Sequence, residues 1–256
     1  MMRSITQDKP RKKKIAWWSI LVWLAVWQVA AMAIGEPLLL ASPIQVIGTL
    51  ASLAGTAAFY SEVLFSFVRI AAGFFLAAVA AVILASEAFR HSAFESLVEP
   101  LMRIIRSIPV ASFIILVLVW ISSRNLSIMI SFLIVLPVIY SSTLEGLKQT
   151  DSQLLEMASV FRVKQSARIR YIYIPEAFPY FRSACSVSLG LAWKSGIAAE
   201  VIGMPLGSMG ERLYQAKIFL DTPALLAWTV AIVLVSYGFE KLVLLLLDLV
   251  RRRVER

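Results

Sequence analysis

The chain of 256 residues is 59% hydrophobic, and only 16% of its residues carry charged side chains. Soluble globular proteins are about half apolar and about a quarter charged, and charges this sparse cannot solvate the surface of a globule of this size. These values exclude a soluble protein and indicate an integral membrane protein. The net charge of +9 does not indicate a nucleic-acid partner, because membrane proteins collect Lys and Arg in their inner loops.

The supply of metal-binding and nucleophilic residues also restricts the function. The chain has one histidine, His91, and one cysteine, Cys185. A single cysteine excludes an internal disulfide. A single histidine leaves no histidine-based metal site or triad that can be assembled. An intramembrane enzyme would need paired carboxylates, a Ser–His pair or a metal cluster at membrane depth. We therefore expect a protein without a metal and without enzymatic activity of its own.

Six stretches are long and apolar enough to cross a bilayer, which takes about 20 mostly apolar residues. They cover residues 15–34, 63–85, 102–121, 125–144, 178–199 and 223–247. The third and fourth contain Pro109 and Pro137, which spanning helices tolerate, and Lys194 interrupts the fifth. We expect one transmembrane domain, residues 15–250, between two basic cytoplasmic tails, residues 1–14 and 251–256.

The first of these stretches has a second interpretation. The sequence AMA at residues 31–33 resembles a signal-peptide cleavage site, so the segment could be a leader that is removed. Its apolar stretch is longer than the core of a normal signal peptide, and we therefore expect a retained helix.

The positions of the basic residues predict which side of the membrane each loop occupies. With six spans and the N-terminus inside, the inner segments hold 19 of the 25 Lys and Arg residues. The outer loops hold three, which are Arg124, Arg212 and Lys217. Because inner loops are enriched in Lys and Arg, both termini are expected in the cytoplasm.

Two outer segments have patterns of their own. Ser42 is expected to cap a helix that Pro43 begins and Gly55 ends. The apolar face of this helix comprises Ile44, Ile47, Leu50, Leu53 and Ala54. We expect the helix to lie on the outer membrane surface. The segment GMPLGSMGERLYQAKIFLDTP, residues 203–223, is too polar to cross the membrane and is expected to form an outer cap over the space between the helices.

The inner segment from Leu154 to Pro175 combines basic residues with an apolar pattern. Residues at helical spacing form its apolar face, which comprises Leu154, Leu155, Met157, Ala158 and Phe161, with Glu156, Ser159 and Arg162 on other faces. Ser166 is expected to cap a second helical piece, which Pro175 ends. The pattern is compatible with a basic loop lying on anionic headgroups or with a docking element for a cytoplasmic partner.

The same segment resembles the cytoplasmic loop of permease subunits of bacterial ATP-binding-cassette importers, which reads E-A-A, three residues, G, nine residues, I-x-L-P. Residues 156–158 and 172–175 keep this spacing, while Arg162 stands at the position of the glycine. In the family, that glycine allows a sharp turn between two short helices. Further stretches are similar to the nitrate, sulfonate and taurine branch of these permeases: ASPIQVIGTL, SFVRIAAGF, RIIRSIPV, AFPYFRSACSVSLGLAWKSGIAAEVIG and LDLVRRRVER.

The resemblance implies an all-α integral membrane fold of the type I importer kind in the bacterial cytoplasmic (inner) membrane. The implied fold has six transmembrane helices, cytoplasmic termini and a coupling helix within residues of about 150–175. A second permease copy is implied to complete the translocation pathway. An extracytoplasmic solute-binding protein delivers the solute, and a cytoplasmic ATP-binding subunit receives the coupling helix. This chain has no G-x-x-x-x-G-K-[ST] phosphate loop, so ATP and Mg are expected in the partner subunit. The implied docking residues are Glu156, Met157, Ala158, Ser159, Phe161, Arg162, Lys164 and Ser166.

Four residues are candidates for the solute pathway. Arg69 and Lys194 lie within spans, where a charge costs about 2.5–3.5 kcal/mol at the bilayer centre. They either reach out to the interface or form a positive funnel for an anionic solute, which Glu200 opposes as an acid near Lys194. Trp193 is either a pathway residue or an interfacial anchor. Ser188 lies on a small-residue surface that suits close helix contact or a pore lining.

The substrate stays open at this level. The resemblance and the two cations favour a small organic anion such as a sulfonate, whereas related permeases also import vitamins or vitamin precursors, pyrimidine-like or flavin-like. A membrane scaffold without transport is a third alternative. A scaffold, however, has no need for the spacing from Glu156 to Pro175.

Overall fold

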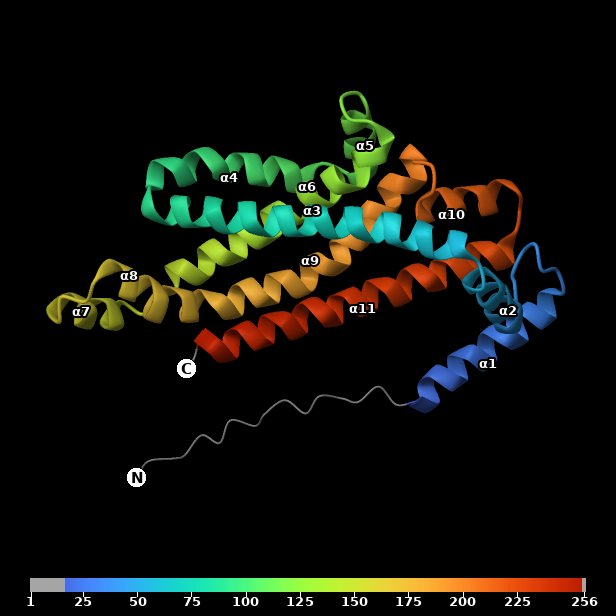
Figure 1. Cartoon of the computed structure of the whole chain (residues 1–256), viewed down its shortest axis with the longest axis horizontal. Coiled ribbons are helices and arrows are strands. Elements are labelled where there is room, and N and C mark those ends of the chain that lie inside the picture. Colours follow the sequence, from blue (N-terminus) through green and yellow to red (C-terminus); the bar gives the residue numbers. More distant parts are fainter. Residues whose placement is uncertain (1–16, 255–256) are drawn as a thin grey trace.

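The computed structural model describes residues 17–254, which form helices and connecting turns without a strand in that range. Figure 1 shows an elongated bundle whose long helices run roughly along one axis. One end, here named the loop end, carries α7 (Ser152–Val160) and α8 (Gln165–Arg168). The other, named the cap end, carries α2 (Pro43–Ala54) and α10 (Met209–Ile218). The predicted all-helical class is confirmed for the described residues.

Three helices form the core of the bundle: α3 (Ala57–Arg90), α6 (Ser123–Lys148) and α9 (Ile174–Gly203). Helices in lipid gain little from hydrophobic burial, so small residues that permit close packing matter more. A Cβ added to Gly196 of α9 would lie 2.7 Å from the Ile70 side chain and 2.8 Å from Ser131 Oγ. Ser131 also donates a hydrogen bond of 3.1 Å to the Ala192 carbonyl. At Ala192 and Gly196, the small-residue surface is therefore a contact between helices.

Three described helices are long and apolar enough to cross a membrane: α3, α6 and α11 (Thr222–Val254). A fourth crossing results if α4 (Ser92–Ser107) and α5 (Val110–Leu118) are counted as one bent span. α1 (Trp17–Ile34) is a shorter apolar helix. The start of the predicted first span and the basic segment 1–14 lie outside the described residues.

The third predicted span, residues 102–121, is not one continuous helix. α4 and α5 differ in direction by 104°, and α5 projects from the bundle in Figure 1. The break falls at Ile108 and Pro109, which have ψ angles of 127° and 133°. Pro109 has no backbone N–H to donate, and its ring disfavours helical geometry at the residue before it. Pro137, by contrast, lies inside the continuous α6.

The short helix predicted from Ser42 to Gly55 is confirmed as α2. Ser42 Oγ accepts a hydrogen bond from the Gln45 N–H at 3.3 Å, and Gln45 Oε1 accepts one from the Ser42 N–H at 2.9 Å. These reciprocal bonds satisfy two N–H groups that have no partner within the helix. Pro43 occupies the first turn, and Gly55 is the residue at which the helix ends.

The apolar face predicted for α2 is only partly packed against the bundle, through Leu50 and Leu53. Ile44 and Ile47 are exposed, whereas Val46 is buried against Ala227 of α11 and against Trp27 of α1. α11 covers the side of α2 on which Val46 lies, and sequence spacing alone did not reveal that neighbour.

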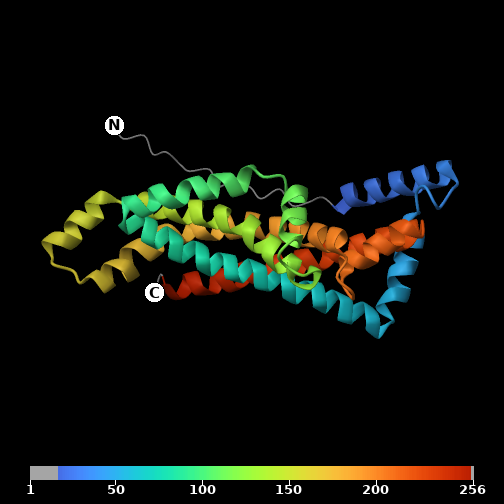
Figure 2. The ribbon, with the colours of Figure 1, turned by 90° about the horizontal axis from the view of Figure 1, so that it is seen from above.

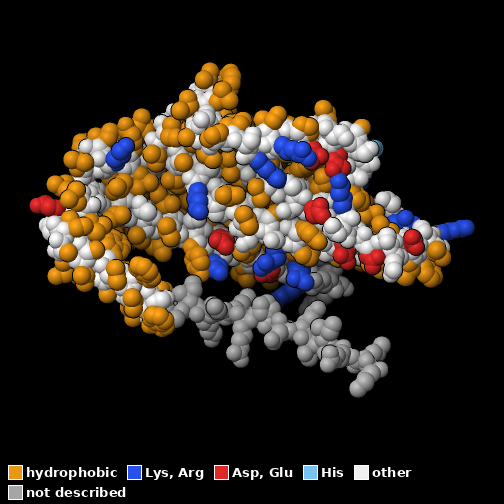
Figure 3. Space-filling view, turned by 180° about the vertical axis from the view of Figure 1, so that it is seen from behind, with side chains coloured by type: hydrophobic (Ala, Val, Ile, Leu, Met, Phe, Trp, Pro, Cys, Tyr) orange, Lys and Arg blue, Asp and Glu red, His pale blue; other side chains and the backbone are white. Residues whose placement is uncertain are grey.

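Hydrophobic side chains cover much of the surface seen in Figure 3, and most charged side chains on that face lie in the half toward the loop end. α11 reaches Val254, so residues 251–254 of the predicted basic C-terminal segment are helical.

Candidate functional site

The predicted coupling loop forms two short helices joined by a tight turn. Arg162 adopts a φ of 51°, in the left-handed region that glycine enters most easily. Its N–H donates to the Ser159 carbonyl at 3.1 Å, and the Val163 N–H donates to the Ala158 carbonyl at 2.9 Å. This pair of bonds is the pattern that usually ends a helix with glycine. The sharp turn of the family is therefore present here with arginine in the glycine position.

Side chains close both ends of α7. Asp151 caps its start by accepting a hydrogen bond from the Gln153 N–H at 2.8 Å. At its end, Arg168 donates from Nε to the Val163 carbonyl at 3.0 Å and from Nη2 to the Ala158 carbonyl at 3.1 Å. The last carbonyls of a helix lack partners within it, so this guanidinium supplies donors that the helix itself cannot.

The second helical piece of the loop differs from the prediction. Ser166 lies inside α8 and is not its cap. Pro175 does not end the helix, because the chain stays helical through η1 (Ile169–Tyr173) into α9. The Ile174 N–H donates to the Ile169 carbonyl, a bond that spans five residues rather than four. The wider turn accommodates the following proline, which has no N–H and crowds the preceding turn.

The loop presents most of its predicted docking residues to the surface. The exposed ones are Glu156, Met157, Ser159, Phe161, Arg162, Lys164 and Ser166. Ala158 is 2% exposed and supports the turn instead. Met157, Val160 and Phe161 together form an exposed apolar edge of α7, and Figure 2 shows this helix projecting beyond the bundle. Clustered apolar side chains on a surface commonly mark an interaction site.

The four candidate pathway residues do not meet at one open site. Trp193 and Ser188 are buried, and the Trp193 ring packs against two phenylalanines of α3 and α11. Lys194 is exposed and Arg69 is half-buried. In this conformation only the two cations are accessible to a solute, and the pathway role of all four stays a prediction.

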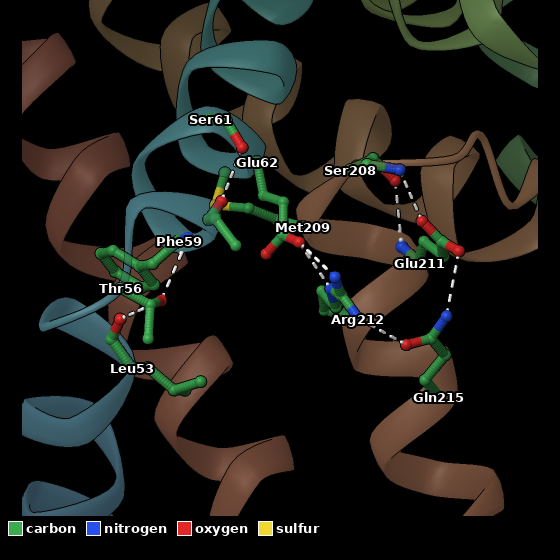
Figure 4. Close-up of polar contacts among 12 residues, drawn as sticks. Leu53, Thr56, Phe59, Ser61, Glu62, Ser208, Met209, Glu211, Arg212 and Gln215 are labelled. Atoms are coloured by element: carbon green, nitrogen blue, oxygen red, sulfur yellow. Dashed lines mark hydrogen bonds and ion pairs between the residues drawn. The ribbon is translucent and has the colours of Figure 1, made fainter.

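At the cap end, a polar network joins α10 to α3 (Figure 4). Arg212 Nε donates to Glu62 Oε1 at 2.7 Å, and Glu62 is only 4% exposed. Gln215 extends the network, accepting from Arg212 Nη1 at 2.9 Å and donating to Glu211 Oε1 at 3.0 Å. The hydrogen bond to Glu62 holds the pKa of the Arg212 guanidinium above its ordinary value.

A second buried carboxylate, Glu200 of α9, binds the start of α10. Its Oε2 accepts from Ser66 Oγ at 2.6 Å and from the Gly210 N–H at 3.3 Å, while Ser66 Oγ accepts from the Met209 N–H at 3.0 Å. The first N–H groups of a helix lack internal partners and carry partial positive charge, so a carboxylate suits this position. Gly210 permits the contact, since an added Cβ would lie 2.3 Å from Glu200 Cβ.

Sequence reasoning did not find these cap-end contacts. It counted Arg212 as an outer-loop charge and Glu200 as an acid near Lys194, and it did not consider Glu62. The available signal was residue type, because an acid in an apolar helix requires a partner. The partner of Glu62 lies 150 positions away in the sequence, a separation at which no periodic pattern can identify it.

Apolar helices of spanning length and a largely hydrophobic surface define a helical membrane protein, and its two-helix loop projects from the bundle. Within the described residues, no group of three or more His, Cys, Asp and Glu side chains could hold a metal ion. The chain belongs to the family of binding-protein-dependent transport system inner membrane components, whose family model matches residues 73–256. It is thus an inner-membrane permease component of an ATP-binding-cassette importer. In importers of this kind, ATP hydrolysis resides in a separate subunit.

Three relatives indicate the branch of the family. The chain is 26% identical over 247 residues to a permease of Bacillus subtilis (strain 168) whose name provisionally assigns it to aliphatic sulfonates transport, with 94% of this chain and 89% of that protein covered. It is 24% identical over 227 residues to the taurine transport system permease of Escherichia coli (strain K12), covering 86% and 81%. The nitrate import permease of Synechococcus elongatus is 24% identical over 206 residues, covering 76% and 73%. The predicted nitrate, sulfonate and taurine branch is confirmed.

Proposed function

We propose that this chain forms the translocation pathway of an ATP-driven importer for a small organic anion such as a sulfonate. The loop of α7 and α8 couples the pathway to a cytoplasmic ATPase, which binds ATP and Mg. A second copy of the chain completes the pathway, and an extracytoplasmic solute-binding protein docks at the cap end.

The topology takes the long axis of the bundle as the membrane normal, with the loop end in the cytoplasm. Six crossings then come from α1, α3, the bent pair α4 and α5, α6, α9 and α11. Charge supports this orientation, because basic residues concentrate on the inner side of membrane proteins. Elements that meet at the loop end carry Arg90, Lys148, Arg162, Lys164, Arg168, Arg170, Arg251 and Arg252, whereas those at the cap end carry Arg212 and Lys217.

The observation that carries the coupling role is the exposed apolar edge of α7, formed by Met157, Val160 and Phe161. A short helix that presents apolar side chains can insert them into a groove of a partner. The bonds of Arg168 and the turn at Arg162 fix this helix without the partner's help. A helix that keeps its shape transmits a displacement of the partner to α6 and α9, the core helices that flank the loop in sequence.

An anionic substrate is supported by two independent features. The relatives are named for aliphatic sulfonates, taurine and nitrate, all of which present negatively charged oxygens. In this chain the accessible candidate pathway residues, Arg69 and Lys194, are both cations, which attract such solutes.

Co-purification of the ATP-binding subunit with the full permease in detergent tests the coupling role. Phe161→Asp places a charge on the apolar edge of α7 and is expected to reduce the recovered ATPase about tenfold or more, as the loss of a buried aromatic anchor does in other interfaces. Phe219→Asp is the matched control, because Phe219 ends α10 as Phe161 ends α7 and the two are 78% and 75% exposed.

Equal recovery of the ATPase with both variants would refute docking through α7. Failure of any ATPase to bind the wild-type chain would favour the scaffold alternative over a transporter.

A further inference from the structure

The Arg69 side chain on α3 is held in a fixed orientation. Its Nε donates to the Arg124 carbonyl at 2.6 Å, and its guanidinium carbon lies 3.6 Å from the centre of the Phe65 ring. One nitrogen and one face of the guanidinium are thus engaged. Among the described residues, none accepts a hydrogen bond from its two Nη atoms. A planar guanidinium with a free Nη pair matches the two oxygens of a carboxylate, nitrate or sulfonate.

Arg124 supplies a second positive group near the Arg69 guanidinium. Its exposed side chain lies in the first turn of α6, on the residue whose carbonyl accepts the Arg69 hydrogen bond. Ser122, which precedes this helix, does not cap it with its side chain. The N-terminus of a helix carries partial positive charge, so the N-terminus of α6 adds to the positive charge of the two arginines.

A groove of about 1190 Å³ lies between α3 and the start of α6, and its wall includes sequence neighbours of both arginines but neither arginine itself. Ala72 lies in it one helical turn from Arg69, and Ser122 and Asn125, on either side of Arg124 in the sequence, are polar members of its wall. The rest of the wall is mainly apolar. A small anion in the groove would therefore find its charge partners at the end marked by Arg69 and Arg124.

We infer that Arg69, oriented by Phe65 and by the Arg124 carbonyl, binds one oxyanion group of the transported solute at this end of the groove, with Arg124 as a second cation. The inference rests on the proposed import of an anion and specifies the group that is recognised: a planar or tetrahedral oxyanion such as a sulfonate or nitrate.

Glu200 of α9 is the acid whose charge bears on this cluster. It acts electrostatically on Arg69, but its Oε2 is bonded to Ser66 and to the Gly210 N–H, and it forms no ion pair with Arg69 among the described contacts. Even with Glu200 counted as ionised, two arginines leave the cluster one positive charge in excess. The site therefore favours an anion over a neutral or cationic solute.

Thiol labelling of the full chain in lipid nanodiscs tests the site without the ATPase or ATP. Ala72→Cys places a thiol in the groove, and the native Cys185 is only 1% exposed, so the unsubstituted chain measures background. The probes are 2-sulfonatoethyl methanethiosulfonate, an anion, and its trimethylammonium counterpart, a cation. The anionic probe is expected to react faster, and excess methanesulfonate should slow it more than sodium chloride at equal ionic strength.

Substitutions on this background separate charge from geometry. Arg69→Gln should lower the ratio of anionic to cationic labelling about tenfold, the effect of one nearby charge on two oppositely charged probes, and should abolish protection by methanesulfonate. Arg69→Lys should keep most of the ratio but lose the protection, because an ammonium has no planar fork. Lys217→Gln, which removes an exposed cation from α10, should change neither.

An unchanged ratio and unchanged protection in Arg69→Gln would overturn the inference, as would equal protection by chloride. If Arg69→Gln does not fold, persistence of methanesulfonate protection in Arg69→Lys would overturn it. Equal recovery of the ATPase with Phe161→Asp and Phe219→Asp would contradict the coupling role and leave this result unaffected, so the two proposals fail separately.

Discussion

The short helices α7 and α10 are built alike but held differently. Each ends in the same hydrogen-bond pattern around a non-glycine residue with positive φ, Arg162 at 51° and Leu220 at 54°. Each is followed by an exposed phenylalanine, Phe161 or Phe219. The two helices, at opposite ends of the molecule, therefore share the same kind of C-terminal turn.

The difference lies in the contacts that hold each helix. The start of α10 is bonded to Glu200 of α9 and Ser66 of α3, and Arg212 is paired with Glu62 of α3. The side-chain bonds of α7, from Arg168 and Asp151, stay within ten residues in sequence. Long-range bonds make α10 part of the core, whereas local bonds give α7 a fixed shape and leave its apolar edge free for a partner.

The largest expected effect comes from disturbing the start of α10. In Gly210→Ala, the new Cβ would lie 2.3 Å from Glu200 Cβ and 2.7 Å from backbone atoms of α9, and backbone cannot move aside locally. We expect a loss of about 3 kcal/mol in the free energy of unfolding, the upper part of the usual range for overpacking. Titration of the chain with sodium dodecyl sulfate in mixed micelles, followed by circular dichroism, measures it.

The control for this variant is Gly48→Ala in α2, where no atom lies within 4 Å of the added Cβ. Alanine is the better helix former by about 1 kcal/mol, so this variant should be at least as stable as the wild type. If Gly210→Ala is no less stable than Gly48→Ala, α10 is not packed against α9 as described.

A smaller effect is expected from breaking the ion pair between α10 and α3. Arg212→Met leaves the buried Glu62 carboxylate without its partner, which costs about 3–5 kcal/mol when a pair is fully buried. The Arg212 side chain is 41% exposed, so we expect about 2 kcal/mol after allowance for solvent screening. The same detergent titration measures this loss.

Glu62→Gln combined with Arg212→Met tests the cause of that loss. Glutamine removes the stranded charge, so the double variant should be more stable than Arg212→Met alone. If the double variant is less stable, Arg212 contributes through packing of its side chain rather than through charge pairing. In that case an ion pair is not what holds α10 more firmly than α7.

The sequence was sufficient to predict elements whose signals are local. Ser42 and Gly55 bounded α2 correctly, and long apolar stretches located the middle of α3, α6 and α11. The break at Pro109 was not predicted, because the same residue type is accommodated at Pro137 inside α6. Proline in an apolar stretch allows both outcomes, and the surrounding helices decide between them.

For the candidate site, the spacing from Glu156 to Pro175 located the loop, but the hydrogen bonds that hold the loop in shape were not apparent. Arg168 is one of four cations in residues 154–175. Only the fold brings its guanidinium to the carbonyls at the end of α7. The network at the cap end was missed for a related reason. Glu62 and Arg212 are far apart in the chain, and a single sequence contains no information that pairs them.

The smallest expected effect compares the two positive-φ residues directly. Glycine removes the steric cost of left-handed geometry but gives the unfolded chain more freedom, so Arg162→Gly and Leu220→Gly should each stabilise their own turn by about 0.5 kcal/mol. Because α10 is bonded to the core, Leu220→Gly should raise the global midpoint of unfolding. Because α7 can open alone, Arg162→Gly should leave that midpoint unchanged and slow hydrogen exchange of α7 amides about twofold.

Hydrogen exchange measured by mass spectrometry on both variants separates these outcomes. Arg162→Asn serves as the charge control, since asparagine also tolerates positive φ and likewise removes the cation. It should slow exchange in α7 nearly as much as glycine if backbone geometry is the cause. A shift of the global midpoint by Arg162→Gly as large as that by Leu220→Gly would mean that α7 unfolds together with the core. In that case the loop would be anchored as firmly as the cap, and the distinction between a free docking helix and a fixed one would fail.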